Sequence, residues 1–151
     1  MIVSKIITTC FGIGYIRKGA GTVAALFCCL FWYWLGGANI GWLFQLSLLV
    51  LLFFLGVLTS FVVEKEWGKD SNHVVVDEVH GMLVALFLLP LNWYYLLAAF
   101  VLFRFFDITK PLGVKRMENL PGGWGVMMDD VLAGLYSNVL LQVTVNSHLF
   151  T

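Results

Sequence analysis

Charged residues are scarce in this sequence. Only 12% of its 151 residues are charged, against about 25% in a typical soluble domain, while 60% are hydrophobic and the mean hydropathy is +0.90. The formal net charge is zero, so no basic excess favours a nucleic-acid partner. The composition predicts a single integral membrane domain over residues 1–151 rather than a water-soluble enzyme.

Cysteine and histidine are equally scarce, which limits the metal sites that the chain can build. The three cysteines, Cys10, Cys28 and Cys29, are odd in number and lie in or beside apolar segments. This pattern is typical of small buried side chains, and it excludes a disulfide framework. Of the three histidines, His80 lies three residues after Asp77, and we interpret it as structural rather than as a ligand.

Long apolar runs separated by polar turns predict an all-α membrane bundle of about four to five helices. The clearest spanning helix is Ile40–Val63, about 24 residues without a charge. Thr22–Leu35 is shorter, and a turn at residues 36–39 joins it to that helix. The last predicted helix runs from Val126 to about Val145, after a polar loop at 109–125. The first 11 residues are expected to form a short helix at the membrane interface.

The segment between Asp77 and Asp107 decides the topology. Read as one span from Met82 to Phe103, it would place the two carboxylates on opposite sides of a membrane. However, Pro90-Leu91-Asn92 interrupts this run with turn residues, so we predict a helical hairpin of residues 74–89 and 93–108. All eighteen charged side chains then lie on one face or in the interfacial segment, and that face is predicted to be cytoplasmic.

Five of the nine carboxylates fall in three clusters, Asp77-Glu78, Asp107 and Asp129-Asp130. A carboxylate in the middle of a bilayer costs roughly 2.5–3.5 kcal/mol, so the cheapest arrangement gathers all five at one membrane surface. Carboxylates clustered without histidine or cysteine suit Mg²⁺. The plainer interpretation is that the acidic residues stabilise helix N-termini through the helix dipole.

Two further groups suit a phosphate ligand. Arg104, Asp107 and Lys110 share one helical face at intervals of three residues, either as a salt-bridge ladder or as a carboxylate for metal with cations for phosphate. The segment 19–22 opens an apolar helix with Gly21-Thr22, where backbone amides can hold an anion. A simple glycine turn explains this segment equally well.

Four strings of residues resemble the phosphatidylglycerophosphatase A family of membrane lipid phosphatases. They are Lys69-Asp70 with Val74–Met82 (VVVDEVHGM), Phe103–Pro111 (FRFFDITKP), Gly122–Gly134 (GGWGVMMDDVLAG) and the glycine-rich Gly12–Gly14 with Gly21-Thr22. Their order and spacing extend over nearly the whole chain. One departure is Ala20, where the family usually has a proline.

The resemblance implies a multi-pass enzyme of the bacterial inner membrane whose active site faces the cytoplasm. It would hydrolyse the terminal phosphate monoester of phosphatidylglycerophosphate to phosphatidylglycerol and phosphate, with Mg²⁺ required. Alternatives are a phosphatase acting on another lipid phosphate and a non-enzymatic membrane scaffold or ion carrier.

The resemblance also assigns expected roles to residues. The catalytic carboxylates would be Asp77, Glu78, Asp107, Asp129 and Asp130, with Asp77, Glu78, Asp129 and Asp130 as metal ligands. A carboxylate that is not bound to metal would act as the base. Substrate binding would fall to Arg104, Lys110, Lys115, Arg116, Gly21 and Thr22.

Overall fold

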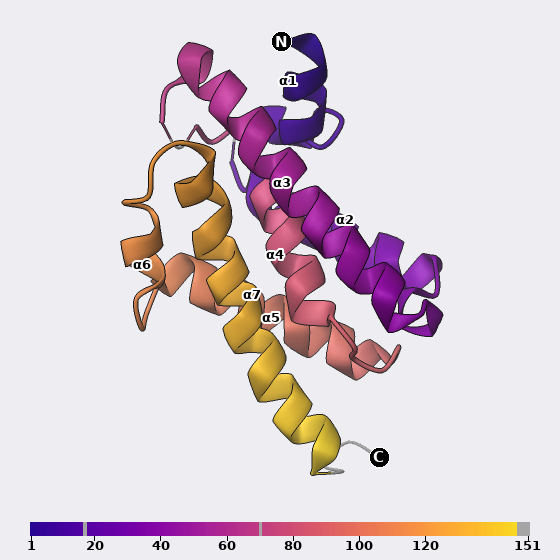
Figure 1. Cartoon of the computed structure of the whole chain (residues 1–151). Coiled ribbons are helices and arrows are strands. Elements are labelled where there is room, and N and C mark those ends of the chain that lie inside the picture. Colours follow the sequence, from indigo (N-terminus) through magenta and orange to yellow (C-terminus); the bar gives the residue numbers. More distant parts are fainter. Residues whose placement is uncertain (17, 70, 148–151) are drawn as a thin grey trace.

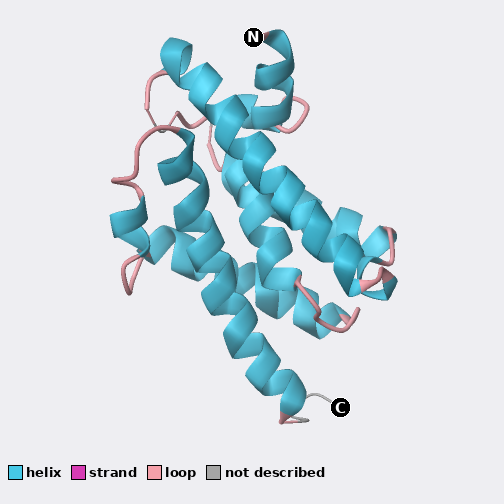
Figure 2. Ribbon diagram, in the orientation of Figure 1, coloured by secondary structure: helices cyan, strands magenta, loops and turns pink. Residues whose placement is uncertain are grey.

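The computed structural model describes residues 1–16, 18–69 and 71–147, so Asp70 of the first motif lies outside the described residues. Throughout these ranges every regular element is helical, and the all-α prediction is confirmed (Figure 2). The helices are α1 (Ile2–Thr8), α2 (Ala20–Trp34), α3 (Trp42–Trp67), α4 (Val76–Leu86), α5 (Trp93–Thr109), α6 (Val114–Met117) and α7 (Gly123–Asn146), with 3-10 turns at Ile13–Tyr15 and Gly37–Asn39.

Helix α4 forms the centre of the bundle. It packs most extensively against α7, and α2, α3 and α5 also pack on it. In Figure 1, the end of α3 and the starts of α4 and α7 lie toward the top, while the α2–α3 turn lies at the right and the end of α7 at the bottom. The core beside α4 contains the fully inaccessible side chains of Met82, Ala85, Ala99, Phe103 and Ala133. The first turn of α4 is therefore held in place from several sides.

One described helix, α3, is long and apolar enough to cross a membrane, and α2 is a shorter apolar helix. The predicted span Ile40–Val63 corresponds to α3, which starts two residues later and continues through Glu64-Lys65-Glu66. Large apolar side chains of α3 such as Leu51, Phe54 and Leu58 remain exposed. Exposed apolar surface of this extent is typical of a membrane or partner interface.

The predicted hairpin corresponds to α4 and α5, but α4 is shorter than the expected 74–89. At 11 residues it is about 16 Å long, and it ends at Leu86. At the turn, Leu88 adopts a left-handed conformation (φ 56°), and Asn92 caps α5 by accepting a hydrogen bond from the backbone of Tyr94. The proline–asparagine turn thus lies where the sequence placed it, although α4 stops before reaching it.

Polar side chains from α3 and α7 explain why α4 can end inside the bundle. Asn138 donates hydrogen bonds to the carbonyls of Ala85 and Phe87, and Gln142 donates to the same Phe87 carbonyl. Gln45 accepts a hydrogen bond from the backbone N–H of Leu88. These bonds satisfy backbone groups that would otherwise be costly to bury.

The last helix begins earlier than predicted. The segment 109–125 is not all loop, because it contains α6, and α7 begins at Gly123 rather than at Val126. Gly123 lies directly on α3, where a Cβ would come within 2.1 Å of the Val57 carbonyl oxygen. Asp129 and Asp130 consequently lie in the second turn of α7. The helix dipole acts mainly within the first turn, so it does not account for their position.

Candidate active site

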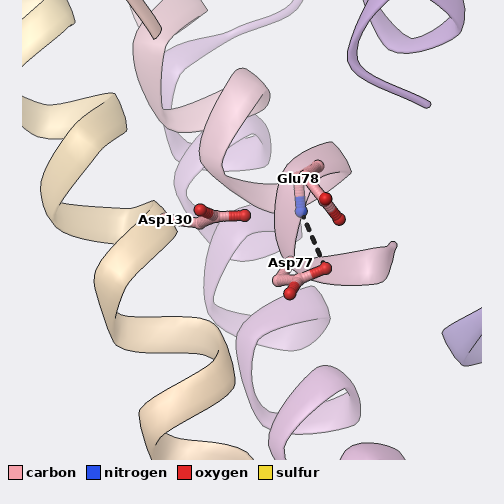
Figure 3. A group of neighbouring side chains, drawn as sticks. All are labelled: Asp77, Glu78 and Asp130. Carbon is pink, nitrogen blue, oxygen red and sulfur yellow. Dashed lines mark hydrogen bonds between the residues drawn. The ribbon is translucent and has the colours of Figure 1, made fainter. Parts of the chain in front are cut away.

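Three carboxylates from two helices form the centre of the candidate site. Asp77 and Glu78 lie in the first turn of α4, and Asp130 projects toward them from α7 (Figure 3). One carboxylate oxygen from each residue lies within 4.8 Å of the others. Asp130 is buried, and Asp77 and Glu78 are largely buried. Residues that are far apart in the sequence thus offer oxygen atoms to one small volume.

A close crossing of α4 and α7 brings these residues together. A Cβ on Gly134 would lie 2.3 Å from the Gly81 carbonyl oxygen, and a Cβ on Gly81 would lie 2.7 Å from the Asp130 carbonyl oxygen. Asp77 is one turn before Gly81, and Asp130 is one turn before Gly134. Because both acidic residues are on the N-terminal side of the crossing, the contact between the glycines places the two carboxylates opposite each other.

The remaining two predicted carboxylates lie at the edge of the same cluster. Asp107, in the last part of α5, interacts electrostatically with Glu78, Asp129 and Asp130. The Asp129 side chain is next to Asp130 and is only 10% exposed. The structure therefore brings together all five carboxylates that the sequence predicts for the site.

Among the described residues, two cations form ion pairs with this cluster. Arg104 donates a hydrogen bond of 2.5 Å to Asp107 within α5. Lys110 does not continue that row, because it ends α5 in a left-handed conformation (φ 45°). Instead its Nζ donates to Asp129 at 2.7 Å and also to Glu118. The salt-bridge ladder predicted for one helical face is therefore only half present, and the second cation links α5, α7 and the connector between them.

The surroundings of Lys110 keep it charged. Burial by itself lowers the pKa of Lys110, but the hydrogen bonds and negative charges of Asp129 and Glu118 outweigh burial and raise the pKa above its ordinary value. Lys110 is therefore a permanent cation at physiological pH.

The cluster as a whole carries more negative than positive charge. Five carboxylates face two cations, and two carboxylates 4 Å apart repel each other by about 4 kcal/mol at an effective dielectric constant of 20. The Glu78 Oε2 atom is also buried without a hydrogen-bond partner within the described ranges. A cation liganded by oxygen would relieve both problems, so the residues present fit Mg²⁺.

The glycine segment at the start of α2 lies against this cluster. A Cβ on Gly21 would be 2.0 Å from the Glu78 Oε1 atom, so a side chain there would displace the Glu78 carboxylate. The sequence predicts that backbone amides at this helix start can hold an anion, and the Glu78 carboxylate lies beside Gly21. Thr22, the other predicted binding residue of this segment, is exposed.

The other predicted binding residues lie outside the cluster. Lys115 and Arg116 are exposed on α6, and among the described residues neither forms an ion pair with a cluster carboxylate. His80 packs on α3, where its Nε2 atom lies 3.0 Å from the Leu49 carbonyl oxygen. This contact agrees with a structural role for the histidine.

Beside Asp129 is a polar cavity of about 280 Å³ that sequence reasoning does not identify. Its lining includes Lys69, Glu118 and Asn119. These residues come from two connectors. Lys69 belongs to one of the strings that resemble the family, but no spacing in the sequence distinguishes Glu118 and Asn119 from other loop residues. The cavity offers charged and amide groups beside the acidic cluster, at a size suited to a small polar group.

Comparison with known proteins agrees with the earlier resemblance. The model of the family described as phosphatidylglycerophosphatase A matches residues 6–145. A protein of Bacteroides thetaiotaomicron named putative phosphatidylinositol-3-phosphatase is 46% identical, with 91% of each chain covered.

Two proteins named phosphatidylglycerophosphatase A are also similar. The Haemophilus influenzae protein is 36% identical over 87% of this chain and 82% of its own length. The Escherichia coli protein is 34% identical over 87% of this chain and 77% of its own length. No solved structure matches the chain significantly.

Proposed function

The chain belongs to the phosphatidylglycerophosphatase A family and is a phosphoric monoester hydrolase, and we propose that its substrate is phosphatidylglycerophosphate. It hydrolyses the terminal phosphate monoester to give phosphatidylglycerol and inorganic phosphate, in a reaction that requires Mg²⁺. The observation that carries this proposal is the convergence of the Asp77, Glu78 and Asp130 oxygens on one point.

The proposed metal ligands are Asp77, Glu78 and Asp130, with Asp129 as a fourth. When bound, Mg²⁺ would offset the negative charge of the phosphate and lower the pKa of the attacking water. Arg104 and Lys110 provide N–H donors for phosphate oxygens, and their bonds to Asp107 and Asp129 orient them.

The chain also supplies the proton acceptor for the reaction. A carboxylate of the cluster that is not bound to metal, for which Asp107 is the best placed, accepts the proton of the attacking water. The water oxygen forms a bond to phosphorus while the phosphorus–oxygen bond to the lipid glycerol breaks. The carboxylate then returns its proton to the glycerol oxygen, and the lipid leaves as the alcohol.

We place the enzyme in the bacterial inner membrane as a multi-pass protein with its site at the cytoplasmic face. The length and composition of α3 support this location, as do the exposed apolar side chains around it. Five basic residues belong to the end of α3, the end of α5, α6 and the connector after α3: Lys65, Lys69, Lys110, Lys115 and Arg116. Basic residues concentrate on the cytoplasmic side of membrane proteins.

A second substrate has specific support. The relative with 46% identity is named a putative phosphatidylinositol-3-phosphatase, and a site made of carboxylates and two cations suits any lipid phosphate monoester. Phosphatidylinositol 3-phosphate is therefore the alternative substrate. The family assignment argues against a purely structural scaffold or an ion carrier.

Phosphate release by the purified protein in detergent micelles tests these proposals. The lipids are phosphatidylglycerophosphate, phosphatidylinositol 3-phosphate and phosphatidate, each with Mg²⁺ and with EDTA. We expect phosphatidylglycerophosphate to give the highest kcat/KM, and EDTA to abolish the activity. Faster hydrolysis of the inositol lipid would replace the proposed substrate, and full activity in EDTA would remove the metal from the proposal.

A further inference from the structure

We propose that one acyl chain of the lipid substrate binds along an apolar groove between α2 and α5. Leu26, Cys29 and Leu30 of α2 and Trp93, Leu97 and Phe100 of α5 line this groove. The inference rests on the proposed function, because it assigns the apolar part of the substrate whose phosphate would react at the acidic cluster.

The two helices that line the groove continue from it to the candidate active site. Beyond the inner end of the groove, Gly21 of α2 contacts the Glu78 carboxylate, and Arg104 of α5 attracts that carboxylate electrostatically. At the outer end of the groove, the rings of Tyr33 and Trp93 meet edge to face, with 6.4 Å between their centroids. A molecule lying in the groove would therefore have one end at the acidic cluster and the other at these aromatic rings.

The distance along α2 from the acidic cluster to the aromatic rings fits a lipid chain in one leaflet. Along α2, the distance from Gly21 to Tyr33 is about 18 Å at 1.5 Å per residue. A bilayer has a hydrocarbon core of about 30 Å, so one leaflet is roughly 15 Å thick. With the phosphate at the cluster, an acyl chain of ordinary length would extend along the groove as far as the aromatic rings.

The inner end of the groove has unsatisfied polar atoms that suit a lipid headgroup. The Glu78 Oε2 and Arg104 Nε atoms are both buried without a hydrogen-bond partner among the described residues. An anionic headgroup offers acceptors to the Arg104 guanidinium, and its glycerol hydroxyl offers a donor to a carboxylate. The polar site is thus followed by an apolar groove, as the headgroup of a phospholipid is followed by its acyl chain.

A larger apolar cavity lies elsewhere but is separated from the acidic cluster. It has a volume of about 410 Å³, against about 40 Å³ for the groove, and Val76, Val79 and Leu83 form its α4 wall. At 100° per residue, these three side chains lie on the face of α4 opposite Gly81, whose side carries the crossing with α7. A chain in that cavity would be separated from the cluster by α4 itself. The α2/α5 groove is shallower, so its occupant would keep one side against the surrounding lipid.

Adjacent residues of α2 provide a matched pair for testing this. Leu30 lines the groove and Phe31 lines the larger cavity, at the same depth and with nearly equal exposure of 49% and 47%. We expect Leu30→Trp to raise KM for dipalmitoyl phosphatidylglycerophosphate in mixed micelles about five-fold. Its kcat/KM for the dihexanoyl analogue should change less than two-fold, and Phe31→Trp should leave both values near those of the unmodified protein.

Equal effects of the two substitutions, or no effect of either, would overturn the proposal. Leu97→Trp fills the groove from its α5 wall and replaces Leu30→Trp if that variant does not fold. The kinetic comparison separates chain binding from a general loss of structure, because the dihexanoyl analogue uses the same acidic cluster without occupying the groove.

Photo-crosslinking tests the groove independently of catalysis. Benzoylphenylalanine in place of Leu30 should crosslink to phospholipid in membranes at least about five times more than the same residue in place of Phe31. Crosslinks to a second copy of the chain, or equal lipid labelling at the two positions, would refute the proposed occupant. If no lipid is hydrolysed but benzoylphenylalanine in place of Leu30 still crosslinks lipid selectively, the proposed function fails and the groove remains a lipid site.

Discussion

At the scale of single residues, the site is defined by carboxylates that repel one another. Asp77, Glu78 and Asp130 approach within 4.8 Å, so removing one charge should relieve repulsion in the metal-free protein. The same removal should weaken metal binding, because a ligand is lost. The substitution should therefore raise the stability of the metal-free protein but lower its affinity for metal. Together, these two changes distinguish a metal site from an ordinary acidic cluster.

We expect Asp130→Asn to lower Mg²⁺-dependent phosphate release at least about 100-fold, since loss of even an outer-shell partner of a metal costs 10- to 100-fold. In EDTA the variant should melt at a higher temperature than the unmodified protein, and Mg²⁺ should no longer raise its Tm. Glu66→Gln is the control, because Glu66 pairs with Lys5 away from the cluster. Unchanged activity of Asp130→Asn would exclude it as a ligand.

Lys110 permits a prediction about pH. Its raised pKa means that its stabilising effect is fully present below the unfolded pKa of about 10.4 and is lost only as pH rises through the higher folded value. Lys110→Met should therefore destabilise the protein by roughly 1–3 kcal/mol, by the same amount at pH 7 and pH 9. Denaturant unfolding at both pH values measures this. A destabilisation that disappears by pH 9 would show that the folded protein lowers the pKa of Lys110 instead of raising it.

At the scale of helices, the contact of Gly81 with Gly134 positions the carboxylates proposed to be catalytic. A side chain on either residue must separate α4 from α7, since the nearest atoms include rigid backbone carbonyls. Overpacking of a close contact typically costs 1–3 kcal/mol. The loss of activity should be larger than the loss of stability alone would cause, because the carboxylates lie only one turn from the crossing.

We therefore expect Gly134→Ala to reduce kcat more than about ten-fold and to lower the free energy of unfolding by roughly 2 kcal/mol. The control is Gly41→Ala, because a Cβ at Gly41 would meet no atom within 4 Å and its φ is −54°. Activity assays and chemical denaturation of both variants measure kcat and the free energy of unfolding. If Gly134→Ala retains full activity, the crossing does not set the geometry of the site.

The end of α4 depends on a different set of contacts. Asn138→Leu would leave the Ala85 carbonyl without the side-chain hydrogen bond that it receives, at a cost of roughly 1–3 kcal/mol. Asn146→Leu, at the exposed end of the same helix, should change stability by less than about 0.5 kcal/mol. Thermal unfolding in detergent compares the two. Similar melting temperatures would mean that the Asn138 bonds contribute little.

At the scale of the whole molecule, the topology places the acidic cluster and the basic connectors at one end of the bundle. In Figure 1 this end contains the starts of α4 and α7, and the α2–α3 turn lies at the other end. If the bundle spans a membrane, the two ends face different compartments.

Cysteine labelling in intact and permeabilised cells tests that arrangement. Cysteines replace the exposed residues Asn72 and Asn119 at the charged end and Asn39 and Ser147 at the other, after Cys10, Cys28 and Cys29 are removed. When only the outer membrane has been permeabilised, a membrane-impermeant reagent should label Asn39→Cys and Ser147→Cys. Asn72→Cys and Asn119→Cys should react only after the inner membrane is opened. Labelling of all four cysteine variants while the inner membrane is intact would reject the cytoplasmic site.

The sequence by itself determined the helical class, the turn at Pro90-Leu91-Asn92 and the identity of the acidic clusters. Apolar runs and turn residues are local signals, and carboxylates are conspicuous in a chain with so few charges. It did not determine the early end of α4, the start of α7 at Gly123 or the position of Lys69 and Asn119 beside Asp129. Those features depend on contacts between segments that local patterns do not report.

Only the tertiary structure decided which atoms face one another. The spacing of Arg104, Asp107 and Lys110 predicts one row on a helix, yet Lys110 turns to Asp129 because α5 ends there. The glycines at positions 81 and 134 carry no sign in the sequence that they touch. Their contact places Asp77 and Asp130 opposite each other, since a backbone without side chains lets two helices approach more closely than any other pair of residues would allow.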